Sequence, residues 1–97
     1  MDKNIQAIVN NCSNLTLKIN LGPRYRVSKN GMMHGSLWLE VQQECYRLKL
    51  TGEPKLLLTN FINTITNQKP TFDQGNPVWH LSFDGEMEKI VKYLNEI

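Results

Sequence analysis

The sequence has few of the features that mark zinc-binding and thiol redox proteins. It contains two cysteines, Cys12 and Cys45, which lie too far apart to form a C-x-x-C pair. A metal knuckle or a dithiol redox site is therefore not indicated. We expect two buried, reduced thiols and a cytoplasmic location, with a single disulfide between them as the alternative.

Long apolar runs and phosphate-binding motifs are also missing. The longest aliphatic runs, residues 7–9 and 56–58, are far shorter than the roughly 20 apolar residues that cross a bilayer. The first residues lack the basic and apolar regions of a secretory signal. No glycine-rich nucleotide-binding motif occurs. These absences predict no membrane contact and no nucleotide cofactor.

Residues that could carry catalysis or bind a metal ion occur without a signature. Residues 32–34 (Met-Met-His) form a short tract of soft ligands, but a structural zinc site needs about four suitably spaced ligands. A candidate nucleophile is Cys45 beside Glu44, with His34 or His80 as its base. We interpret all of these residues as structural, and we expect a non-enzyme with no cofactor and no metal.

The composition is that of an ordinary globular domain. The chain has 97 residues, of which 40% are hydrophobic, 11 are basic and 9 are acidic, so its net charge is +2. This length fits one domain spanning residues 1–97.

Hydrophobic periodicity predicts three helices and several strands. Apolar residues spaced three and four apart predict helices near residues 2–11, 54–68 and 85–97, with Asp2 and Asp84 as caps of the first and last. Apolar residues at alternate positions predict strands near residues 15–21, 24–28, 37–42, 46–50 and 78–83. Gly22 should end the first strand, Asn30–Gly31 should form a hairpin turn, and Thr71–Phe72 should be a short extended piece.

The resulting fold class is α+β. We predict a single domain with an antiparallel sheet of about four to five strands and two to three helices packed mainly on one face, in the order α-β-β-β-β-α-β-α. For residues 37–48 a helix is the alternative, because Leu37, Val41, Cys45 and Leu48 also fit one helical face. We favour strands there, since the bulky residues suit a pleated surface.

Charge is distributed unevenly along the chain. Residues 1–50 contain seven basic and three acidic side chains, whereas residues 51–97 contain four and six, and no acidic residue lies between Lys3 and Leu39. We predict a basic sheet face with aromatic residues nearby. The candidate binding residues are Lys18, Arg24, Tyr25, Arg26, Lys29, Trp38, Arg47 and Lys49.

Two functional hypotheses follow from this surface. The favoured one is a small protein-interaction or regulatory module that binds a protein partner or a second copy through a sheet face or edge, with Trp38 as anchor. The alternative is nucleic-acid binding, in which the basic side chains contact phosphates and the aromatic rings stack on bases. If helices covered both faces of the sheet, Trp38 would instead be a core residue.

Overall fold

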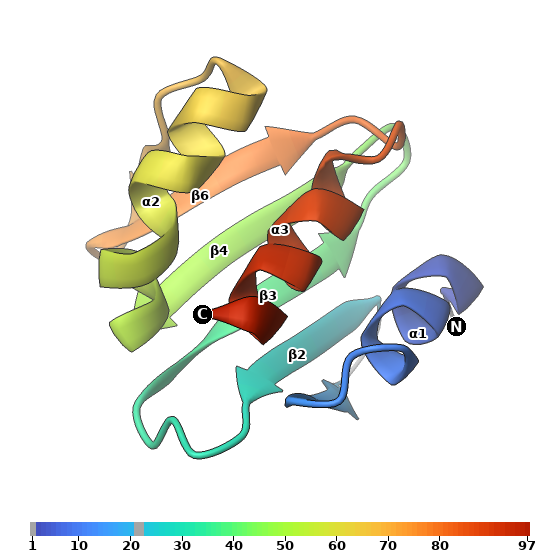
Figure 1. The fold of residues 1–97 in the computed structure, drawn as a ribbon. Helices are drawn as coiled ribbons and strands as arrows, with labels where there is room; N and C mark the ends of the chain where they lie inside the picture. Colours follow the sequence, from blue (N-terminus) through green and yellow to red (C-terminus); the bar gives the residue numbers. More distant parts are fainter. Residues whose placement is uncertain (1, 21–22) are drawn as a thin grey trace.

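Alternating apolar and polar residues build a six-stranded antiparallel sheet in the computed structural model, which describes residues 2–20 and 23–97 (Figure 1). In chain order the elements are α1 (Lys3–Asn10), β1 (Leu15–Ile19), β2 (Arg24–Lys29), β3 (Gly35–Val41), β4 (Tyr46–Gly52), α2 (Glu53–Thr66), β5 (Thr71–Asp73), β6 (Asn76–Leu81) and α3 (Glu86–Glu96). The strand order across the sheet is β1-β2-β3-β4-β6-β5, and every neighbouring pair is antiparallel.

The predicted α+β class is confirmed, with one more strand than the predicted four to five. The additional strand is β5, whose residues Thr71 and Phe72 were predicted only as a short extended piece, because three residues are too few for alternation to be visible in the sequence. The helical alternative for residues 37–48 is wrong, because β3 and β4 pair over seven residue pairs. Leu21 and Gly22, expected at the end of the first strand, lie outside the described residues.

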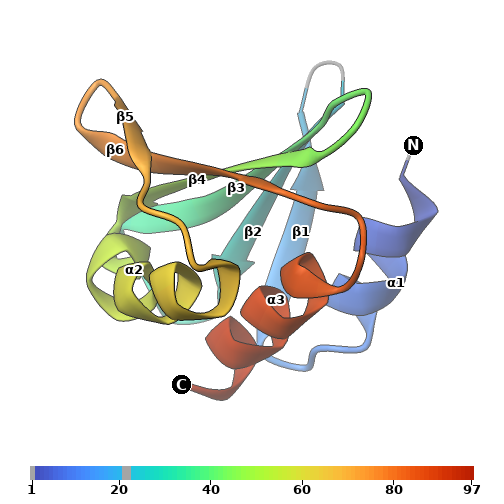
Figure 2. The ribbon, with the colours of Figure 1, turned by 90° about the horizontal axis from the view of Figure 1, so that it is seen from above.

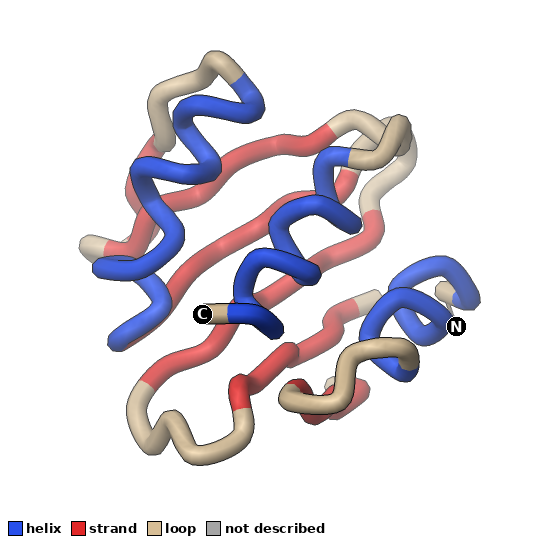
Figure 3. The backbone as a smooth tube through the Cα atoms, in the orientation of Figure 1, coloured by secondary structure: helices blue, strands red, loops and turns tan. Residues whose placement is uncertain are grey.

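The helices form one layer against the sheet. Seen from above, α1, α2 and α3 all lie on the same side, and no described element covers the other side (Figure 2). Figure 3 shows the strands as a continuous layer behind the helices. We call the uncovered side the open face.

The core lies between these two layers. Strand residues such as Leu37, Leu48 and Leu50 are fully buried, as are Ile62 of α2 and Ile90 of α3. Burial of each such side chain contributes roughly 1.5 to 3 kcal/mol to stability.

The core also contains the indole of Trp79 and the thiol of Cys12. Trp79 of β6 is 1% exposed and its Nε1 donates to Asn63 Oδ1 at 3.0 Å. Cys12 is buried, and this burial raises the pKa of its thiol, whereas Cys45 is half-buried. Both cysteines are free, and the prediction that both are buried is wrong for Cys45.

Capping residues set the helix boundaries. The Asp2 side chain accepts the backbone N–H of Ile5 at 2.9 Å, as predicted for the start of α1. Pro54 lies in the first turn of α2, where its missing N–H costs nothing. The predicted cap at Asp84 is wrong: Gly85 is the N-cap of α3, and the Asp84 carboxylate instead accepts the hydroxyl of Ser82.

Two glycines face each other at the end of the β3–β4 pair that adjoins the start of α2. Gly35 (φ +97°) and Gly52 (φ +64°) face each other, and a Cβ on Gly35 would lie 2.0 Å from the backbone oxygen of Thr51. The Glu53 N–H then donates to the His34 oxygen at 3.0 Å. This contact fixes the start of α2 against the end of the β2–β3 loop.

The predicted last strand is too long at its end. β6 stops at Leu81, so Phe83 does not share the strand face of Trp79 and Leu81. Phe83 is 50% exposed, and its ring lies edge-on to Tyr46 with centroids 4.8 Å apart. Among the described residues, no helix is both long and apolar enough to cross a membrane.

Candidate functional site

The open face carries a row of paired side chains from four neighbouring strands. Lys18 lies opposite Arg26, and Arg26 lies opposite Trp38. Trp38 in turn lies opposite Lys49. Because neighbouring strands are about 4.8 Å apart, Trp38 has a cationic side chain on each adjacent strand.

A second row runs beside the first. Arg24 lies opposite Glu40, which lies opposite Arg47, and His80 of β6 continues the row. Arg24, Glu40 and Arg47 each lie two positions from a first-row residue on the same strand, and His80 lies two positions from the β6 residue that pairs with Lys49. Side chains two positions apart on a strand point to the same side, so both rows lie on the open face.

The two rows border a cleft on the open face. It has a volume of about 610 Å³. Its lining residues are Asn20, Arg24, Trp38, Leu39, Glu40, Arg47, Lys49 and Asp73. We call it the open-face cleft.

The indole ring of Trp38 is held in place from two sides. Its Nε1 donates to Thr51 Oγ1 at 3.3 Å, and the guanidinium carbon of Arg26 lies 5.5 Å from the ring centroid. Arg26 is itself fixed, because its Nε donates to Ser36 Oγ at 2.7 Å. The cation–π contact and these hydrogen bonds orient the ring before any ligand arrives.

One edge of the cleft has an ion pair within the strand ladder. Arg24 Nε donates to Glu40 Oε2 at 3.0 Å, and Gln42 Nε2 donates to Glu40 Oε1 at 3.0 Å. The bonds from Arg24 and then Gln42 lower the pKa of the Glu40 carboxyl group. Glu40 is therefore a fixed anion next to Arg24.

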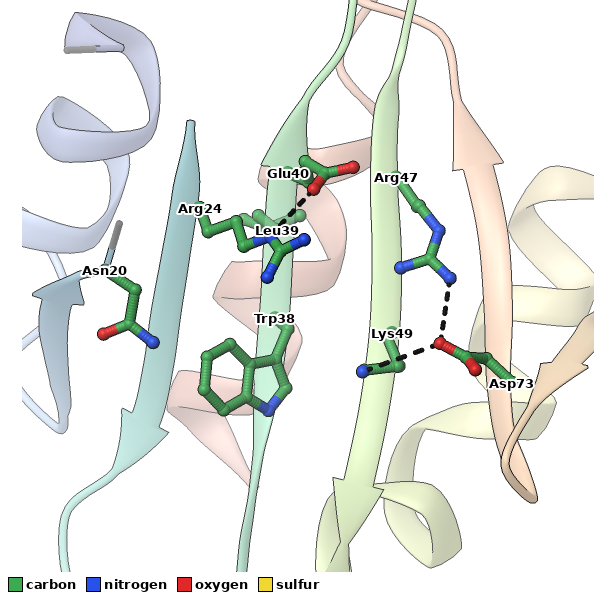
Figure 4. A pocket seen from close by; sticks show the side chains of 8 residues that line it. All are labelled: Asn20, Arg24, Trp38, Leu39, Glu40, Arg47, Lys49 and Asp73. Carbon is green, nitrogen blue, oxygen red and sulfur yellow. Dashed lines mark hydrogen bonds and ion pairs between the residues drawn. The ribbon is translucent and has the colours of Figure 1, made fainter. Parts of the chain in front are cut away.

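The opposite edge is closed by a residue from a distant strand. Asp73 Oδ2 lies 3.2 Å from Arg47 Nη2 and 3.9 Å from Lys49 Nζ (Figure 4). Since β6 lies between β4 and β5 in the sheet, the carboxylate reaches across β6 to meet both cations.

Cations outnumber carboxylates around the open-face cleft. Five basic side chains (Lys18, Arg24, Arg26, Arg47 and Lys49) lie in the two rows, against the carboxylates of Glu40 and Asp73. The two rows together with Asp73 thus carry a net charge of +3, whereas the charged residues that line the cleft itself, Arg24, Arg47, Lys49, Glu40 and Asp73, sum to +1.

Most of the predicted binding residues share this face. Six of the eight candidates, Lys18, Arg24, Arg26, Trp38, Arg47 and Lys49, lie in the two rows. Trp38 is half-buried and points away from the helices, so it is not a core residue.

The other two candidates require correction. Tyr25 is 2% exposed on the core side, and its hydroxyl accepts the backbone N–H of Asp2. Lys29 also points to the helix side, where Nζ donates to the carbonyl oxygens of Leu94 at 2.9 Å and Asn95 at 3.3 Å. Odd-numbered positions of β2 face the core, so neither residue joins the open-face cleft.

Asn20, Glu40 and Asp73 line the cleft without having been predicted as site residues. Glu40 alternates with Leu39 and Val41 in the sequence, which is a signal for its face. Asp73 had no local signal, because its position depends on the pairing of β5 with β6.

The candidates for catalysis and metal binding do not assemble. Cys45 Sγ donates to Gln42 Oε1 at 3.3 Å, and no hydrogen bond in the described part of the chain joins it to His34 or His80. Met33 is 86% exposed. Within residues 2–20 and 23–97, no three His, Cys, Asp or Glu side chains gather closely enough to hold a metal ion.

Comparisons of the chain with protein-family models, with curated proteins and with solved structures found no match. A functional assignment therefore depends on the chemistry of the protein's own surface.

Proposed function

We propose that the protein binds single-stranded nucleic acid on the open face of its sheet, without catalysing a reaction. The observation that carries this proposal is the position of Trp38 between Arg26 on one neighbouring strand and Lys49 on the other. Proteins that bind single strands combine cations for the phosphates with an aromatic ring on which a base stacks.

The fixed orientation of Trp38 supports a stacking role. Its ring nitrogen and one neighbouring cation already have partners within the protein. A base that stacks on this ring does not have to offset the entropy of ordering it. Each stacked base contributes about 1 to 3 kcal/mol in proteins of this kind.

The charge of the open face supports phosphate contacts. Lys18, Arg24 and Arg26 lie on one side of Trp38, and Arg47 and Lys49 lie on the other. A strand that crosses the sheet along the first row would meet cations before and after the ring. Such contacts predict binding that weakens steeply with salt.

The first prediction tests these cations by charge reversal. The double variant Arg26→Glu, Lys49→Glu should weaken binding of a labelled oligothymidylate of about twelve nucleotides by at least about tenfold at low salt. Fluorescence anisotropy over a salt series measures this. The slope of log affinity against log salt should also fall, by about 0.7 for each phosphate that the variant no longer neutralises.

The matched control carries the same change of charge on the helix side. Lys3→Glu, Lys89→Glu alters two exposed lysines of α1 and α3 and should leave the affinity within about threefold, because screening weakens distant charges. If both double variants weaken binding equally, only overall charge matters and the proposal fails.

Trp38→Leu should separately reduce affinity with no change in the salt slope.

A second candidate is protein binding or self-association at a different surface. Met33, Leu56 and Phe72 are 86%, 88% and 68% exposed. Their segments adjoin, since Glu53 N–H bonds to His34 O and Lys55 Nζ bonds to Asn76 Oδ1 at 3.3 Å. Exposed apolar side chains on adjoining segments favour a protein contact.

A further inference from the structure

Arg47 and Lys49 pair with a carboxylate from a distant strand, whereas Arg24 pairs with one on the neighbouring strand. Arg24 and Glu40 are direct ladder partners, and Gln42 holds Glu40 from its other side. Asp73, in contrast, is two strands away from Arg47 and Lys49 in the sheet order. Its carboxylate is therefore not part of the ladder that positions these two cations.

Arg47 and Lys49 converge on a single oxygen atom. Only 28% of each side chain is exposed, and both approach Asp73 Oδ2. Two residues apart on β4, they point to the same face. The arrangement is that of an anion site whose present occupant is a carboxylate.

The occupant is held weakly. Asp73 is 45% exposed, and ion pairs with this exposure to water add little to stability. It lies at the end of a three-residue strand, next to a tight turn in which Gln74 (φ 52°) and Gly75 (φ 82°) are both left-handed. The β5–β6 pairing does not depend on the carboxylate, because backbone groups form it.

We propose that Arg47 and Lys49 form a phosphate subsite of the open-face cleft and that Asp73 occupies this subsite as an internal competitor until nucleic acid displaces it. This inference rests on the proposed function. A phosphate brings more charge and more acceptor oxygens than one carboxylate oxygen, and arginine binds it through two parallel hydrogen bonds. Asp73 would then lower the apparent affinity of the subsite, because a phosphate must displace the carboxylate before it can bind Arg47 and Lys49.

The second prediction replaces the competitor by its neutral isostere. Asp73→Asn should tighten binding of the labelled oligothymidylate by about three- to tenfold at low salt, with a smaller gain as salt is raised. The control Glu88→Gln removes a carboxylate from the Lys92–Glu88 pair of α3, on the helix side. It should leave the affinity within about twofold.

A second variant keeps the test decisive if the first alters the hairpin. Arg47→Met should weaken binding more in the Asp73→Asn background than in the natural chain, because Asp73 masks Arg47 only in the latter. Equal effects of Arg47→Met in both backgrounds would overturn the inference. So would Asp73→Asn binding no tighter than the natural chain.

The outcomes separate this inference from the proposed function. If the natural chain binds the oligonucleotide and Asp73→Asn binds it equally well, the function stands and the competitor role fails. If only Asp73→Asn binds, the competitor role is supported. If neither binds, both fail. Tighter binding of Asp73→Asn to a decaglutamate peptide than to the oligonucleotide would assign the subsite to a protein carboxylate and overturn the phosphate assignment.

Discussion

At the scale of the residue, alternation along a strand decides which side chains a ligand can meet. Tyr25 and Arg26 are neighbours in the sequence, yet Tyr25 is 2% exposed in the core and Arg26 contacts Trp38 on the open face. A single-residue shift in register would exchange their environments. The nearby run of basic residues therefore contributes to the site only at every second position.

The third prediction concerns Glu40 and pH. Its lowered pKa means that the ionised carboxylate stabilises the fold, and this contribution is lost as the pH falls through that lowered pKa. Because Arg24 is 64% exposed, water screens the pair and the contribution is about 0.5 kcal/mol. Urea unfolding from about pH 6 to about pH 3 measures it.

Glu40→Gln serves as the comparison for this pH series. Its free energy of unfolding should fall less with acidification than that of the natural chain, since the pH dependence of all other carboxyl groups is shared. Parallel curves for the two proteins would show that the Arg24–Glu40 pair does not couple to folding.

At the scale of the element, glycine is required where the backbones of β3 and β4 meet. Gly31 and Gly35 both have positive φ, +85° and +97°, but a Cβ on Gly31 would meet nothing within 4 Å. On Gly35 it would clash with the backbone of Thr51. At either position a side chain would force a residue other than glycine into a left-handed conformation. Only at Gly35 would the side chain also clash with neighbouring backbone.

The fourth prediction uses this pair. Gly31→Ala should cost about 1 to 2 kcal/mol of unfolding free energy, the usual penalty for a left-handed alanine. Gly35→Ala should cost at least about 2 kcal/mol more, or prevent folding, because the clash is with backbone and cannot be relieved by a rotamer change. Urea unfolding of both variants measures the difference. Equal costs would show that β3 and β4 can separate locally at little expense.

The elements show where sequence patterns were informative. Alternation over five or more residues predicted β1 to β4 and β6, and with them the shared sheet face of Trp38 and Lys49. It did not decide whether helices cover that face, because this depends on how the three helices pack. β5 shows no alternation over its three residues, so the position of Asp73 followed only from long-range pairing. The cap at Asp84 failed for a local reason, since the Ser82 hydroxyl bonds to its carboxylate.

At the scale of the whole molecule, the two faces of the sheet differ in composition. Helices cover one face of the sheet (Figure 2), and the cationic rows occupy the other. A chain with a net charge of +2 can therefore present a local charge well above its average to a polyanion. A polyanion responds to the electrostatic field of the surface that it approaches, and not only to the net charge of the whole chain.

The fifth prediction follows from this asymmetry. On a sizing column with multi-angle light scattering, the free protein should elute as a monomer and should co-elute with short single-stranded DNA or RNA at low salt. The complex should be lost by about 0.3 M salt. A salt-insensitive dimer that carries no nucleic acid would instead favour the second candidate, and Leu56→Ser should then disperse it.

The placement of the two tryptophans, Trp79 beneath the helices and Trp38 on the open face, has a spectroscopic consequence. The two tryptophan fluorophores lie in environments that differ in their access to water. Iodide should quench the emission of Trp38 and spare that of Trp79. With Trp38→Phe the remaining signal reports unfolding alone, and with Trp79→Phe it reports occupancy of the cleft, so folding and binding can be followed optically in the same protein without a label.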